Sequence, residues 1–268
     1  MTNPKQQVRD FWDQAACGEV YAVGADLAGQ FAAQARSRYA LEPYLRPFAG
    51  FDGSGKDVLE VGVGMGADHV EWARSTPTRL AGVDFSARAI DWTSRRLALA
   101  GLDSDLTIAD AESLPFPDAS FDIVYSWGVL HHTPDVEAAF RQVHRVLRPG
   151  GEARIMVYHR PSVVGALLWT RYGLLSGSPG RSLADVYAHH LESPGTKGYT
   201  VEEGRQLVRQ FTSADVRVQL SFGDLLQGAV GQQHDGISLK LAKKLWPRLL
   251  IKRLLPLHGL ALLIRAVK

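Results

Sequence analysis

Short apolar runs alternate with segments of helical period between residues 57 and 158, and this alternation organises the chain. The runs predict buried strands at 57–61, 79–83, 105–109, 121–126 and 150–158. The segments between them predict helices at 66–75, 86–101 and 134–147. Strands that alternate with helices are typical of an α/β fold built on a parallel sheet.

Two helices precede this core. Residues 4–16 form an amphipathic pattern whose apolar side holds Val8, Phe11 and Trp12. Residues 27–47 show helical spacing of apolar side chains up to Pro43 and Pro47, which are expected to close the helix. Neither helix is part of a minimal strand-helix core.

Two long insertions follow residue 158. The segment 160–199 is rich in aromatic and histidine side chains among Gly and Pro, which is typical of a lid or binding loop. A helix at 200–211 and a strand at 216–222 come next, and the second insertion, 224–257, separates them from a last strand at 258–267. The turn Arg148-Pro149-Gly150-Gly151 is expected to end a helix and start the fifth strand.

Glycine occupies every second position after the first predicted strand, at Gly62, Gly64 and Gly66. Because glycine has no Cβ, a ligand can lie against this main chain, and the next helix presents unpaired N–H groups to it. Such a turn is typical of the nucleotide-binding corner of a Rossmann-like sheet. Glu60, just before the turn, is either a ligand contact or a strand-end acid exposed to water.

Acids also end the next two predicted strands. Asp84 is placed where a carboxylate accepts hydrogen bonds from a ribose diol. The third strand leads into Asp110, Ala111 and Glu112. No lysine of the kind that binds phosphate follows Gly66, which favours a ligand without phosphate.

Five motifs together resemble the class I S-adenosylmethionine-dependent methyltransferases, in particular the small-molecule group that includes quinone and sterol methylating enzymes. They are VLEVGVGMG at 58–66, GVDFS at 82–86, ADAESLPFPDASFD at 109–122, SWGVLHH at 126–132 and HRVLRPGG at 144–151. Their common order over about 100 residues makes coincidence a poor explanation. A nicotinamide-dependent oxidoreductase, the rival assignment, shares only the first two motifs.

The resemblance implies a Rossmann-like seven-stranded mixed sheet, its last strand antiparallel, with helices on both faces. Residues 1–50 would be an N-terminal helical lid, and residues 51–268 the methyltransferase domain with its two helical insertions. The cofactor would be S-adenosyl-L-methionine. By position, the glycine turn and Glu60 would contact its methionine part, Asp84 and Phe85 its ribose side, Asp110, Ala111 and Glu112 its adenine, and Trp127 and Gly128 its sulfonium.

Methyl transfer from a sulfonium requires mainly alignment of donor and acceptor and exclusion of water. An acceptor hydroxyl or acidic carbon also requires a base, for which histidine is suited near neutral pH. An alkene acceptor would instead favour aromatic walls around a carbocation. The candidates for the catalytic group are His159 after the fifth strand, His131 and His132 after the fourth, and Tyr21 beside the N-terminal helix.

A metal site is not expected. His189, His190 and Glu192 are close in sequence, but neighbouring histidines on a regular element point in different directions and no further ligands follow at a matching spacing. We interpret this cluster as lid lining or surface. The one cysteine, Cys17, excludes an intrachain disulfide and is expected to line the pocket or to pack.

Charge is distributed unevenly along the chain. Residues 236–268 hold eight Lys or Arg and no acid, whereas the first 235 positions hold 22 basic and 28 acidic residues. Lys240, Lys244, Arg248 and Lys252 recur every four residues opposite Leu241, Leu245 and Leu249. We expect a surface helix packed on the body, and the alternative is peripheral contact of the 236–257 segment with anionic membrane lipid. Nucleic acid is not expected as a partner, because leucines rather than stacking aromatics accompany the cations.

These patterns predict a cytoplasmic enzyme that methylates a small, largely apolar acceptor on oxygen or carbon. The sequence shows no apolar run long enough to span a membrane and no signal-peptide core at its N-terminus. An aromatic, quinone or prenyl-type natural product would suit the apolar insertions. The alternatives are a catalytically silent cofactor-binding subunit, a lipid or sterol methyltransferase at a membrane surface, and a protein or RNA methyltransferase. Both a monomer and a homo-oligomer are consistent with the sequence.

Overall fold

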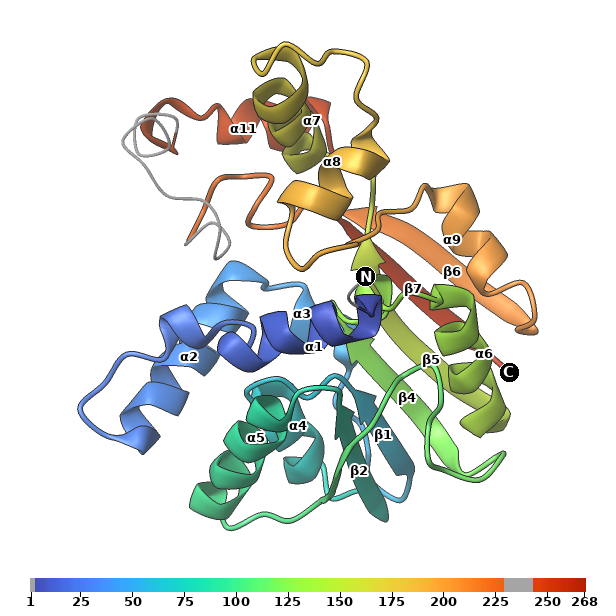
Figure 1. Cartoon of the computed structure of the whole chain (residues 1–268). Helices are drawn as coiled ribbons and strands as arrows, with labels where there is room; N and C mark the ends of the chain where they lie inside the picture. The colour runs from blue at the N-terminus through green and yellow to red at the C-terminus, as the bar shows by residue number, and fades with distance from the viewer. Residues whose placement is uncertain (1–2, 229–242) are drawn as a thin grey trace.

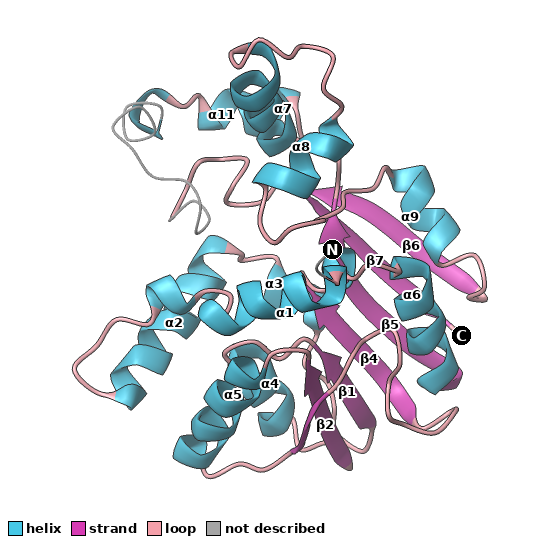
Figure 2. Cartoon of the chain, in the orientation of Figure 1, coloured by secondary structure: helices cyan, strands magenta, loops and turns pink. Residues whose placement is uncertain are grey.

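The computed structural model describes residues 3–228 and 243–268, and its centre is one sheet (Figures 1 and 2). The strand order is β3-β2-β1-β4-β5-β7-β6. The strands are β1 (Asp57–Val61), β2 (Arg79–Asp84), β3 (Asp105–Ile108), β4 (Phe121–Trp127), β5 (Leu147–Tyr158), β6 (Ser213–Gln219) and β7 (Ala261–Val267). Strands β1 to β5 pair in parallel, and β7 is antiparallel to both β5 and β6. The predicted Rossmann-like mixed sheet is thus confirmed.

Alternate side chains of each strand supply two separate hydrophobic cores, one on each face of the sheet. On β1, Val58 packs on one face, and Leu59 and Val61 pack on the other. On β4, Ile123 and Tyr125 share the face of Val58. The central strands are buried on both sides, which explains why they appear in the sequence as nearly continuous apolar runs.

Helices cover both faces (Figure 2). The face of Val58 packs against α3 (Leu45–Ala49), α4 (Ala67–Arg74) and α5 (Ala87–Ala100). The opposite face packs against α6 (Val136–Val146), and the segment of α9 (Val201–Leu207) and the residues after it close the same core. No helix within 3–228 and 243–268 is both long and apolar enough to cross a bilayer.

The N-terminal helices differ in part from expectation. Helix α1 (Pro4–Gln14) is capped by Asn3, whose side chain accepts a hydrogen bond from the backbone of Lys5. The expected single helix at 27–47 is wrong, because α2 (Leu27–Leu41) ends before Pro43 and α3 follows separately. The residue before a proline avoids helical backbone angles, so Glu42 ends α2.

The strands after residue 146 also differ from their expected limits. Strand β5 begins at Leu147 rather than after the Pro-Gly-Gly turn, and the register shifts within the pairing of β4 with β5 around that turn. Strand β6 ends at Gln219, three residues before the expected end, because Ser221 and Asp224 form a turn that also binds the backbone of Leu260. This turn therefore sets where β7 can begin.

The first insertion is helical, with α7 (Val163–Trp169), the π-helical turn η3 (Thr170–Leu174) and α8 (Leu183–His190). The second insertion contributes α11 (Arg248–Leu254), which directly follows Pro247. In Figure 1 these helices gather at one end of the molecule, beyond the sheet. Lys240 and Leu241 of the expected basic helix lie outside the described residues.

The prediction of which side of the basic helix packs on the body is wrong. Leu245 and Leu249 were expected to face the body, but they are 72% and 85% exposed. Ile251 is buried instead and packs with Val163 of α7 and with Leu225. Helix α11 therefore rests on the body through a different side, and its leucines face outward.

Candidate active site

A cavity of ≈ 1430 Å³ lies where β1, β2, β4 and β5 end. Its walls include α1, the glycine turn and parts of both insertions. Open α/β sheets bind ligands at the carboxyl ends of their strands, so the position is the one that the strand pattern predicts. The volume exceeds what a single drug-sized ligand fills, and thus leaves room for two ligands.

The glycine turn forms one wall of this cavity. Gly62, Gly64 and Gly66 have φ angles of 88°, 53° and 72°, which favour glycine. A Cβ on Gly62 would lie 2.1 Å from Val129, and one on Gly66 would lie 2.9 Å from Thr93. A Cβ on Gly64 would meet no protein atom within 4 Å, so this main chain faces open space. Gly62 and Gly64 line the cavity, whereas Gly66 lies behind it.

Glu60 is a buried cavity residue and not a water-exposed strand end, because it is only 3% exposed. Its Oε2 lies 2.9 Å from Nδ1 of His69, whose Nε2 lies 2.8 Å from the Ser104 hydroxyl. Burial raises the pKa of Glu60 well above its ordinary value and lowers that of His69 to about 3. The sequence around His69 gave no signal for this partnership.

Asp84 lies at the end of β2 and lines the cavity beside Phe85. Its two carboxylate oxygens accept hydrogen bonds from the backbone N–H groups of Gly64 and Ser86, each at 3.0 Å. The carboxylate retains acceptor capacity for a ligand. Burial raises the pKa of Asp84, while these backbone bonds act in the opposite direction.

Asp110 and Ala111 line the cavity, but Glu112 does not. Lys5 of α1 reaches across and lies 2.5 Å from a carboxylate oxygen of both Asp110 and Glu112. Glu112 also accepts a hydrogen bond from the backbone of Asp135 at 2.8 Å. The structure therefore gives Glu112 a role in holding α1 and the start of α6.

Trp127 and Gly128 line the centre of the cavity, where the glycine turn meets the insertions. Trp127 packs against Phe48 with ring centroids 5.8 Å apart. Tyr21, from the short turn η1 (Glu19–Tyr21), also lines the cavity. Cys17 lines it as well and is an exposed residue.

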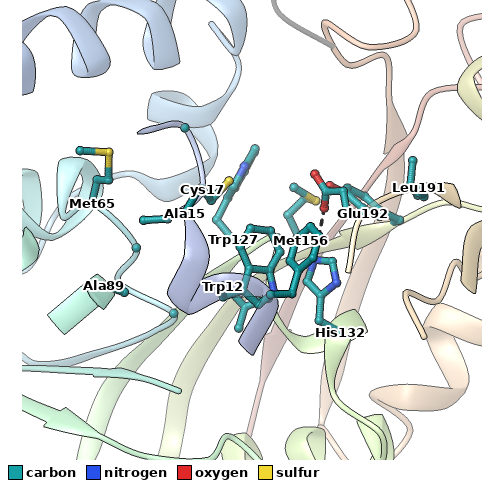
Figure 3. Close-up of a pocket in the computed structure, with 18 of the residues that line it drawn as sticks. Trp12, Ala15, Cys17, Met65, Ala89, Trp127, His132, Met156, Leu191 and Glu192 are labelled. Atoms are coloured by element: carbon teal, nitrogen blue, oxygen red, sulfur yellow. Dashed lines mark hydrogen bonds and ion pairs between the residues drawn. The ribbon is translucent and has the colours of Figure 1, made fainter. Parts of the chain in front are cut away.

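His132 and Glu192 face the cavity next to one another. His132 lies in the turn η2 (Leu130–His132), and its Nε2 is 3.3 Å from Oε2 of Glu192. Tyr158 of β5 donates a hydrogen bond of 2.8 Å to the same carboxylate. Figure 3 shows these two side chains in one space with Trp12, Trp127 and Met156.

The other nitrogen of His132 is fixed by the first insertion. Its Nδ1 lies 2.8 Å from the Ser193 hydroxyl and 3.0 Å from that of Thr196. The Thr196 hydroxyl also donates to the carbonyl oxygen of Ser193 at 2.6 Å, so the first insertion holds this side of the ring in place. Nε2, on the other side of the ring, is buried beside Oε2 of Glu192.

Neither His131 nor His159 is a cavity residue. His131 is fully buried and stacks on Tyr158 at 3.9 Å, and burial lowers its pKa well below the ordinary value. His159 binds the carbonyl oxygen of Gly259 through Nδ1 at 2.9 Å. The strand end that was expected to present His159 to the ligand presents Tyr158 instead, because adjacent residues of a strand point to opposite sides.

The cluster at residues 189–192 is divided between two environments. His189 is exposed and pairs with Asp185, and His190 stacks on Tyr172 with centroids 3.9 Å apart. Glu192 points the other way, into the cavity. Ligand atoms of His131, His132 and Glu192 lie within 4.8 Å of one another, a grouping that spacing could not indicate. The pairing of His132 with Glu192 explains it without an ion, and metal independence stays a prediction.

A buried ionic network in the cavity wall was not predicted. Arg38 of α2 contacts both carboxylate oxygens of Asp68, which also accepts hydrogen bonds from Tyr39 and Tyr125. Glu42 lies 3.8 Å from Arg38 and lines the cavity. The residues come from α2, α4 and β4, so only the folded chain brings them together.

Comparison with known proteins shows what part of the chain resembles. Residues 59–155 match the family model described as a methyltransferase domain. This segment of the chain is therefore similar to methyltransferase domains. The matched residues contain the glycine turn, Asp84, Asp110 and His132.

Two curated relatives share this domain. A 27-O-demethylrifamycin SV methyltransferase of Amycolatopsis mediterranei is 30% identical over 58% of the chain and 59% of its own length. A fatty-acid O-methyltransferase of Mycolicibacterium smegmatis is 39% identical over 43% of the chain and 42% of its own length. The chain thus spans about half the length of these relatives.

Solved structures share the fold over nearly the whole chain. A geranyl diphosphate C-methyltransferase from Streptomyces coelicolor A3(2), in complex with Mg²⁺, geranyl diphosphate and S-adenosyl-L-homocysteine, has a TM-score of 0.64 at 16% identity, covering 99% of this chain and 98% of its own. A phosphoethanolamine N-methyltransferase of Haemonchus contortus has a TM-score of 0.62 at 18% identity, covering 97% and 60%. At this identity the likeness concerns the fold.

Proposed function

We propose that this protein transfers a methyl group from S-adenosylmethionine to a small, largely apolar acceptor, by O- or C-methylation. One observation carries the proposal: a single cavity joins the glycine turn and Asp84 to a second compartment that has apolar walls and the pair of His132 and Glu192. The first part fits the cofactor, and the second part fits a molecule that loses a proton.

The cavity wall has the groups that the cofactor requires. The open main chain at Gly64 and the carboxylates of Glu60, Asp84 and Asp110 lie along one side. The carboxylates suit an ammonium, a ribose diol and an adenine amino group, and Trp127 offers an aromatic face to a sulfonium cation. When bound, S-adenosylmethionine supplies an electrophilic methyl group with a neutral leaving group.

His132 is the residue that we assign as general base. Together with the Glu192 carboxylate beside its Nε2, His132 takes the proton of an acceptor hydroxyl or acidic carbon. The Glu192 carboxylate beside Nε2 stabilises the positive ring that results, and Tyr158 fixes that carboxylate. His131 and His159 contact protein rather than the cavity, so the structure favours His132 over both.

The walls around His132 favour an apolar acceptor. Trp12, Met156, Leu168 and Leu191 line this part of the cavity. They come from α1, β5 and the first insertion, and they exclude water from the reacting groups. An aromatic, quinone or prenyl-type natural product has the shape and polarity that such walls accept.

Labelled methyl transfer tests the proposal. The protein is incubated with methyl-labelled cofactor and a panel of phenols, quinols and prenyl-type acceptors, beside His132→Gln and the control His189→Gln. We expect His132→Gln to lower kcat by about 10²–10⁴-fold and to keep its affinity for S-adenosylhomocysteine. The exposed His189 variant should behave as wild type.

Two outcomes would count against the proposal. Full activity in His132→Gln would remove the assigned base. Binding of the cofactor without transfer to any member of the panel would favour the silent-subunit alternative.

A further inference from the structure

The described part of the second insertion presents leucines and cations to solvent. Leu245, Leu249, Leu250, Leu254 and Leu257 are between 55% and 85% exposed. Lys244, Lys252 and Arg253 lie among them, and none of the three forms an ion pair with another described residue. We call residues 243–257 the basic leucine surface; it contains no acid.

The basic leucine surface is the outer side of a segment whose inner side packs on the body of the protein. Ile251 is buried against Val163 and Leu225. Trp246 donates to the carbonyl of Asp224, and Arg248 donates to that of Leu225. The inner side of α11 is therefore already used, and the exposed leucines form a face that folding of the described chain leaves uncovered.

The composition favours lipid over protein as the occupant. Protein interfaces are depleted in lysine, and their energetic centres are rich in Trp, Tyr and Arg rather than leucine. Leucine mixed with Lys and Arg is typical of segments that lie in the interface of an anionic bilayer. Unpaired cations next to exposed leucines complement phosphate headgroups above acyl chains.

The same end of the molecule borders the cavity. Lys243, the first residue of the surface, lines the cavity, as does Leu175, which is 78% exposed. Leu175 follows η3 of the first insertion, which gathers with α11 at one end in Figure 1. A bilayer against this end would face the part of the cavity that the insertions form.

We propose that the basic leucine surface docks the protein on anionic lipid bilayers, with Leu249 and Leu254 entering the acyl boundary and Lys244, Lys252 and Arg253 binding headgroup phosphates. The cavity then receives its acceptor from the bilayer as an amphiphile, a consequence that rests on the proposed function. Docking itself does not depend on methyl transfer.

Vesicle co-sedimentation of the full-length protein tests this. The vesicles are phosphatidylcholine alone or with phosphatidylglycerol, at low and high salt. We expect binding to the anionic vesicles, weakened by salt. The charge variant Lys244→Glu/Lys252→Glu/Arg253→Glu and the apolar variant Leu249→Gln/Leu254→Gln should each lower the partition coefficient at least about tenfold.

A matched control is available on α5, at the other end of the molecule in Figure 1. Leu99 and Arg95 are exposed there, so Arg95→Glu/Leu99→Gln should bind vesicles as wild type does. Titration with S-adenosylhomocysteine shows that each variant is folded. It also separates a failure of docking from a failure of the proposed function.

Three results would overturn docking. The first is that wild-type protein stays in the supernatant when anionic vesicles are sedimented. Equal binding by wild type and both surface variants is the second. The third is a set of two observations: wild type is a dimer in light scattering, and the surface variants are monomers that bind vesicles as wild type does. The surface would then be a contact between two copies of the chain.

Discussion

At the scale of single residues, burial changes the chemistry of carboxylates that the sequence cannot distinguish from surface acids. Glu42 ends α2, is only 7% exposed and lies 3.8 Å from Arg38. Burial is the largest influence on its pKa and raises it from 4.5 to about 7, although Arg38 acts in the opposite direction. This group therefore titrates close to neutral pH in the folded protein.

The Glu42 pKa predicts a pH-dependent stability. The folded state holds the proton more tightly than the unfolded state, so ionisation lowers the free energy of unfolding as pH rises from 4.5 to 7. Glutamine does not ionise, so the variant Glu42→Gln does not show this decrease in the free energy of unfolding. The free energy of unfolding is measured with urea at pH 4.5 and at pH 8. Relative to wild type, that of the variant should increase by about 3 kcal/mol between these pH values. An equal difference at both pH values would contradict the assigned pKa.

The residues that sequence could identify are those whose position follows from a local rule. The glycines and Asp84 end predicted strands, and the end of a parallel strand is where such a sheet binds ligands. The pairing of His132 with Glu192 follows no local rule, because the first insertion must fold before the two meet. The same reason conceals His69 beside Glu60 and Arg38 beside Asp68.

At the scale of elements, contacts across the cavity connect α1 to the sheet. Lys5 contacts Asp110 and Glu112, Asp13 accepts a hydrogen bond from Ser86 at 2.6 Å, and Arg9 lies over the ring of Phe85. These partners belong to the ends of β2 and β3 and the segments that follow them. We propose that α1 acts as the N-terminal lid that the sequence suggested.

Hydrogen exchange tests this lid. Saturation with S-adenosylhomocysteine should slow amide exchange in α1 at least about tenfold, because a ligand under the helix adds contacts to a part that otherwise opens locally. Exchange in α9, which packs on a different part of the sheet, should not change. Unchanged exchange in α1 would show that the helix does not close over the ligand.

Element boundaries show where sequence patterns stop being informative. The central strands were predicted well because both of their faces are buried, which leaves continuous apolar runs. The limits of β6 and β7 depend on Asp224, which joins a turn to the backbone of Leu260 across the second insertion. Leu249 and Ile251 both fit an apolar helix face, and only packing on Val163 decides between them.

At the scale of the whole molecule, the acidic body and the basic C-terminal part perform separate tasks in this account. We propose that the cofactor occupies the part of the cavity beside the sheet and α1, and that the acceptor occupies the part beside the two insertions. The basic leucine surface lies beside that acceptor part.

Calorimetric titration with S-adenosylhomocysteine tests the central claim most directly, with Asp84→Ala as the variant and NAD as the competing ligand. The account predicts micromolar binding by wild type, a loss of affinity in Asp84→Ala and no comparable affinity for NAD. Absence of binding to S-adenosylhomocysteine, or preference for NAD, would contradict it.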